Sequence, residues 1–161
     1  VTTLTPVAAE ARAQVTFDPE LVRSYRLVGY DNRAIDDGDF DDLSVDAGEL
    51  GAGHQATALY EVRPAEGVAP GTPIGTASVK WAGVGDGVPH QAEVGLESAD
   101  PAADPSASLA LASTVADLAE SLKHVRDLTG LRERAAALDG VDTEELVRLI
   151  DEAERARLYK D

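Results

Sequence analysis

The chain of 161 residues contains no cysteine and no methionine, and aromatic residues make up only 4% of it. The absence of cysteine excludes disulfide bonds, thiolate metal ligands and thiol nucleophiles. Hydrophobic residues still amount to 43% of the chain, which indicates a folded domain rather than a disordered segment. Because these residues are mostly Ala, Val and Leu, we expect a core built from small side chains.

Long apolar runs are also missing. No segment approaches the roughly 18 consecutive apolar residues that a membrane-spanning helix needs, so we expect no direct membrane insertion. The first residues, "VTTLTPVAAE", contain neither an initiator methionine nor the apolar centre of a signal peptide. We therefore expect the chain to be a fragment or a processed form of a longer protein.

Basic residues are few: 14 Lys and Arg stand against 30 Asp and Glu, which gives a net charge of -16. Coulomb repulsion then argues against direct binding to nucleic acid or to an anionic membrane surface. The charge fits a soluble protein, or one that attracts cations.

The first two thirds of the chain contain short segments in which apolar and polar residues alternate. This period of two is typical of antiparallel strands with one face toward water. Turn-forming sequences separate the segments, among them "RPAEGVAPGTP" and "GVGDGVP". The alternating segments are "AQVTF", "SYRLVGY", "ATALYEV", "ASVKWA" and "AEVGLE".

The last third has the periodicity of helices. One apolar stripe consists of Leu111, Val115, Leu118, Leu122 and Val125, spaced by three and four residues. Asp104 followed by Pro105 predicts the start of this helix.

Two further helices are expected after it. A short one spans about 130–138, with Thr129 as its cap and Gly140 past its end. A final one begins after Asp142, with Glu145 completing a capping box. Its apolar stripe is Leu146, Leu149, Ile150 and Ala153.

Strands followed by helices predict an α+β fold. We expect an antiparallel β-sheet or small β-sandwich of about five to seven strands, followed by two or three packed C-terminal helices. The β region would span 15–100 and the helical region 101–161, packed together as one domain over 15–161.

The segment 36–49 is a candidate metal site. It contains seven acidic residues and no basic one, and carboxylates at alternating positions can bind Ca²⁺, which prefers six to eight oxygen ligands. The spacing does not match an EF-hand, so a solvated acidic loop is the competing interpretation. The candidate ligands are Asp36, Asp37, Asp39, Asp41 and Asp42.

Other motifs give no catalytic arrangement. "GELGAG" at 48–53 lacks the ending of a phosphate-binding loop and is expected to form a turn before a strand that begins near His54. The three histidines have no zinc-ligand spacing, and no nucleophile-elbow motif is present. Paired carboxylates are too common here to identify a hydrolase. We therefore expect a protein that is not an enzyme and has no cofactor of its own, apart from the Ca²⁺ alternative.

An ordered set of motifs resembles one known family. "VTFDPELVRSYRLVGYDNR", then "DFDD", then "VDAGELGAGHQATALYEV", is similar to the C-terminal domain of bacterial von Willebrand factor type A proteins of the YfbK type. The resemblance is dense over about 15–62 and looser through Ala77 to Trp81 and Glu145 to Ala153.

This resemblance implies the context of the chain. A von Willebrand factor type A domain, with its own divalent metal site, would precede it, and residues 1–14 would be the connection from that domain. The implied location is the bacterial cell envelope or the extracellular space. The implied role is that of an accessory domain that contacts the A domain and a further, unknown protein partner.

Two interpretations of "SYRLVGYDNR" follow. In one, Tyr25, Leu27 and Tyr30 are core residues, and the arginines pair with Asp31, Asp46 or Glu49. In the other, Tyr30, Asn32 and Arg33 form an interaction surface, because Arg and Tyr are enriched at protein interfaces.

Overall fold

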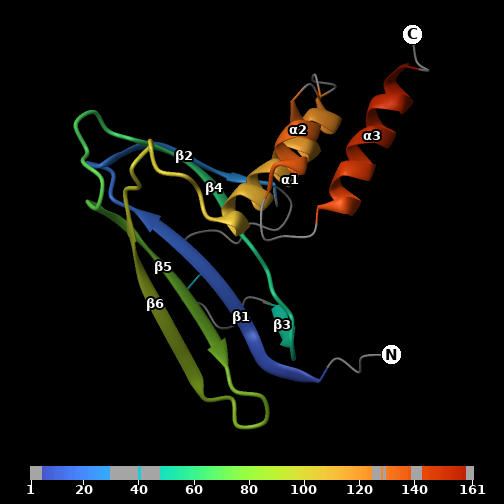
Figure 1. Ribbon diagram of the computed structural model, residues 1–161. Coiled ribbons are helices and arrows are strands. Elements are labelled where there is room, and N and C mark those ends of the chain that lie inside the picture. Colours follow the sequence, from blue (N-terminus) through green and yellow to red (C-terminus); the bar gives the residue numbers. More distant parts are fainter. Residues whose placement is uncertain are drawn as a thin grey trace. The chain divides into compact units, whose positions relative to one another are not determined.

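A computed structural model describes residues 5–29, 40, 48–124, 128, 130–138 and 143–158 (Figure 1). The chain divides into two compact units, Val1–Pro101 and Ala102–Asp161. This division falls next to the boundary predicted between the β region and the helical region. The packing of the two units into one domain stays a prediction.

The predicted α+β class is confirmed. In the described residues, six strands in antiparallel sheets precede three helices. The strands are β1 Pro6–Phe17, β2 Val22–Val28, β3 Gly48–Gly51, β4 Leu59–Pro64, β5 Pro73–Ala82 and β6 Pro89–Glu97. The helices are α1 Ala107–Lys123, α2 Leu131–Ala136 and α3 Glu144–Leu158.

Strand β1 lies inside a four-stranded sheet with the order β3-β1-β5-β6 (Figure 1). Residues 6–14, which the sequence assigned to a connection, therefore belong to a paired strand. Whether they follow an A domain stays a prediction. The turn expected at "GELGAG" is wrong in its first half, because Gly48–Gly51 pairs with the start of β1. The next strand, β4, begins at Leu59, later than the predicted position near His54.

The register of the sheet separates apolar from polar residues. Val15 lies opposite Ala77, and Ala77 lies opposite Val94, so the three share one face. On the other face Gln14 lies opposite Ser78, whose hydroxyl donates a hydrogen bond of 2.8 Å to Glu93. The alternation seen in the sequence is thus the alternation between the two faces.

Strands β2 and β4 form a separate two-stranded ribbon. Three aromatic rings connect it to the end of β1: the Phe17 ring centroid is 4.7 Å from that of Tyr25 and 5.8 Å from that of Tyr60. The prediction that Tyr25 is a core residue is wrong, because 52% of its surface is exposed. Leu27 is half-buried, and Tyr30 lies outside the described residues.

The helical unit has its own hydrophobic core, to which all three helices contribute. Ala135 and Ile150 are completely buried in it. The predicted stripes are confirmed at Leu118, Leu146 and Ile150 but wrong at Val115, Leu122 and Leu149, which are 45–49% exposed. The core consists of Leu118, Leu128, Leu131, Ala135, Leu146 and Ile150, with Leu111, Val147 and Ala153 packed against it.

The caps of the helices differ from those expected. Helix α1 is capped by Ser106, whose hydroxyl accepts a 3.3 Å hydrogen bond from the Leu109 amide, so the prediction of Asp104 as the cap is wrong. Helix α2 begins after Gly130, whose φ of 81° lies in the left-handed region that glycine adopts without steric strain. Thr129, Gly140, Asp142 and Val125 lie outside the described residues.

A substitution in the helical core tests this packing. We expect Ile150→Ala to lower the free energy of unfolding by about 2–5 kcal/mol, because it leaves a cavity at a completely buried position. The neighbouring Leu149→Ala should cost about 0.5 kcal/mol or less, since Leu149 is 45% exposed. Urea unfolding followed by circular dichroism measures both. Equal losses would contradict the assigned burial.

The sheet offers a second matched pair. A Cβ atom at Gly75 would collide with the backbone carbonyl oxygen of Thr16, whereas at Gly95 it would meet nothing within 4 Å. We therefore expect Gly75→Ala to destabilise the β unit by about 1–3 kcal/mol, and Gly95→Ala to be much milder. Hydrogen exchange of the β1 and β5 amides reports on this. Unchanged protection in Gly75→Ala would contradict the close approach of β1 and β5.

Candidate functional site

The residues that the sequence predicted to form an interaction surface or a Ca²⁺ site all fall in two segments that the structure does not describe, 30–39 and 41–47. The predicted interaction residues Tyr30, Asn32 and Arg33 follow the end of β2, and the predicted Ca²⁺ ligands Asp36, Asp37, Asp39, Asp41 and Asp42 follow them. Both sites stay predictions. Among the described residues, no group of three or more His, Asp or Glu side chains could hold a metal ion.

Strand β2 ends at Val28, two residues before Tyr30, and forms the two-stranded ribbon with β4. Its register places Ser24 opposite Arg63 and Arg26 opposite Glu61, so these four side chains share one face. We call them the polar face of the ribbon. Tyr25 and Tyr60 lie on the other face, where they contact Phe17.

An open hollow of about 510 Å³ lies on the ribbon. The polar face contributes most of its lining, and residues from both strands take part. The lining residues are Ser24, Tyr25, Arg26, Glu61, Val62 and Arg63.

An ion pair occupies the middle of the polar face. The Arg26 Nε–H group donates a 2.6 Å hydrogen bond to Glu61 Oε2. This bond, and the positive charges of Arg26 and Arg63, lower the pKa of Glu61 below its ordinary value of 4.5. Glu61 was not among the partners expected for Arg26, of which Asp31 and Asp46 lie outside the described residues.

The ribbon is basic in a chain that is acidic. Arg23, Arg26 and Arg63 stand against one carboxylate, Glu61, within the two strands. In the part of the chain that the structure describes, Arg63 forms no ion pair, whereas Arg26 is paired with Glu61. The polar face therefore carries one positive charge that is not neutralised by contact.

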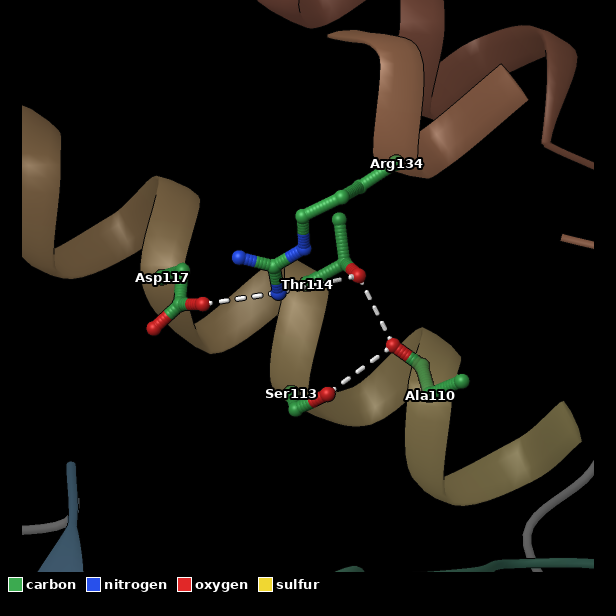
Figure 2. Close-up of polar contacts among 5 residues, drawn as sticks. All are labelled: Ala110, Ser113, Thr114, Asp117 and Arg134. Carbon is green, nitrogen blue, oxygen red and sulfur yellow. Dashed lines mark hydrogen bonds and ion pairs between the residues drawn. The ribbon is translucent and has the colours of Figure 1, made fainter. Parts of the chain in front are cut away.

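A second polar cluster joins helices α1 and α2 (Figure 2). Arg134 Nη2 donates a 2.8 Å hydrogen bond to Asp117 Oδ2 and lies 3.5 Å from Thr114 Oγ1. The hydroxyls of Ser113 and Thr114 both donate to the Ala110 carbonyl, at 3.0 and 2.8 Å. Because the Thr114 hydroxyl proton is used within the helix, the cluster stabilises the contact of α1 with α2 and does not present an activated nucleophile.

A third cluster sits at a β-bulge in β1. Between the pairs Ala9–Ala82 and Arg12–Lys80, β1 contains one residue more than β5 does. Glu10, within this bulge, adopts a φ of 53°. The bulge directs Arg12 inward, where its side chain is fully buried, with Nη2 3.6 Å from Glu10 Oε2. Sequence reasoning missed this site because a lone Arg in an alternating segment is ordinarily solvated.

The fold and these sites define an α+β protein with an open β ribbon and a small helical unit. A family model described as "Uncharacterized protein YfbK, C-terminal" matches residues 2–82. The chain belongs to this family. The match covers strands β1 to β5 and ends before β6 and the helices.

A curated relative gives the same result. The chain is 41% identical over 59 residues to "Uncharacterized protein YfbK" of Escherichia coli (strain K12). The matching segment is 37% of this chain and 10% of that relative. No solved structure matches. In the described residues, no helix combines the length and apolar character needed to span a membrane.

The Arg26–Glu61 pair gives a test of the ribbon geometry. We expect Arg26→Gln to raise the pKa of Glu61 toward 4.5, because the hydrogen bond from Arg26 is the largest cause of its lowering. Arg63→Gln should raise it less, since Arg63 acts only through its charge. NMR titration of the Glu61 carboxyl carbon measures both shifts.

The sign of the pH effect follows from the lowered pKa. The charged pair is present above the ordinary pKa of Glu61 and is lost as the pH falls through its folded value. A titration in which Arg26→Gln leaves the pKa of Glu61 unchanged would contradict the Arg26–Glu61 ion pair.

Proposed function

We propose that this chain is a non-enzymatic accessory domain C-terminal to a von Willebrand factor type A module, and that it supports protein–protein interaction at the bacterial cell envelope. The observation that carries the proposal is the family match. The family is described as a C-terminal region, and the segment shared with the curated relative amounts to 10% of that relative. A C-terminal region of this kind is one part of a longer protein, next to other domains.

The chemistry of the described sites supports a binding role. The carboxyl group in the hollow, Glu61, has a lowered pKa, which is the opposite of what a general acid requires. The hollow is open, and exposed Arg and Tyr residues are among those that line it; both residue types are enriched at interfaces. The divalent metal of this proposal belongs to the A module, and Ca²⁺ binding by the loop 36–49 is the alternative.

Co-expression of the A module and this chain as separate polypeptides tests the proposal. We expect the two to co-purify, and the thermal midpoint of at least one to rise on mixing, because a ligand that binds only the folded form stabilises it. An A module from an unrelated protein is the control. Absence of both association and stabilisation would overturn the proposed role.

A further inference from the structure

We propose that the polar face of the β2–β4 ribbon docks an extended segment of a partner protein rich in Asp or Glu, with Arg63 as the anchoring cation. This inference rests on the proposed function and deepens it, because it names the chemistry of the partner. It depends on three observations: the shared face, the state of its charges and the shape of the surface.

The shared face follows from the strand register. Ser24 and Arg63 are direct partners, and Arg26 and Glu61 are the next pair on the same side. A guanidinium group and a hydroxyl side by side can both donate hydrogen bonds to one carboxylate. A partner chain running along the ribbon would present its carboxylates on one side at every second residue, which matches the spacing of a strand.

The charges favour an anionic partner that is short. Arg26 already shares its charge with Glu61 at 2.6 Å, whereas Arg63 forms no ion pair with the described residues. Arg63 is therefore the cation that is available to a new carboxylate. The net charge of -16 on the chain repels a long polyanion such as nucleic acid, but a short peptide contacts only the ribbon.

The surface is accessible to an extended chain. The hollow of about 510 Å³ is bordered by residues of both strands. The four residues of the polar face, Ser24, Arg26, Glu61 and Arg63, are all exposed. On the opposite side of the ribbon, Tyr25 and Tyr60 contact Phe17, so the aromatic contacts leave the polar face uncovered.

Binding of a labelled peptide with glutamate at every second position tests the inference. The full chain is titrated at low salt and followed by fluorescence anisotropy, with a lysine-containing counterpart and a single-stranded oligonucleotide as competing probes. We expect the glutamate peptide alone to bind, and Arg63→Gln to weaken its binding about tenfold. Arg63→Lys, which keeps the charge, should retain part of the affinity.

Glu61 provides a variant with the opposite sign. Glu61→Gln removes the carboxylate that competes for Arg26, so we expect it to tighten binding several-fold. Arg148→Gln and Glu145→Gln are the matched controls, because they make the same changes of charge on helix α3, where the two side chains lie 3.8 Å apart. If these control variants change the peptide affinity as much as Arg63→Gln and Glu61→Gln do, the effects come from net charge alone and the docking site is overturned.

Other outcomes are decisive as well. No binding of the glutamate peptide, or binding that Arg63→Gln leaves unchanged, overturns the inference, as does equal binding of the oligonucleotide. Replacing Asp36, Asp37, Asp39, Asp41 and Asp42 by Asn tests whether the chain's own loop is the occupant. If the peptide binds only after that change, the chain's own loop occupies the polar face and the inference is wrong.

Association of the chain with the A module is measured in a separate experiment. The proposed accessory role can therefore hold even if the polar face does not bind the peptide.

Discussion

Pairing of strand β1 along both of its edges is the interaction on which the β unit depends. β3 pairs with the first half of the strand and β5 mainly with the second. The bulge at Glu10 lies where the two pairings overlap, and a bulge bends the strand and increases its local twist. The strand then ends at Phe17, whose ring contacts the β2–β4 ribbon. The aromatic side of the ribbon faces this contact, and Arg26 and Arg63 lie on the other side.

The sequence predicts the fold class and most of the strands because hydrophobic alternation is a local signal. It locates β2, β4, β5, β6 and the second half of β1, and it places Leu118, Leu146 and Ile150 in the helical core. It misses β3, since "GELG" has the composition of a turn and becomes a strand only by pairing with β1. It misplaces the first cap because Asp104 and Ser106 are both good caps, and only the geometry of the first turn distinguishes them.

The candidate site was harder to predict than the fold. The partner of Arg26 depends on the register between β2 and β4. Its partner Glu61 lies 35 positions away along the chain. A shift of one residue would place Arg26 beside an apolar side chain, so the sequence around Arg26 alone cannot identify Glu61. The exposure of Tyr25 has the same origin: bulky residues stand on both faces of "SYRLVGY", and which face is covered depends on Phe17, from another strand.

Strand β6 lies at the end of the sheet order, and eight of its nine residues are exposed. An open edge of this kind is a template on which a second copy could add. Glu93 is the middle residue of the strand, so an antiparallel, in-register encounter of two copies would bring Glu93 against Glu93. Repulsion between these carboxylates opposes such growth near neutral pH. The net charge of -16 adds repulsion between whole copies of the chain, so edge-to-edge growth is opposed both at this strand and over the rest of the molecule.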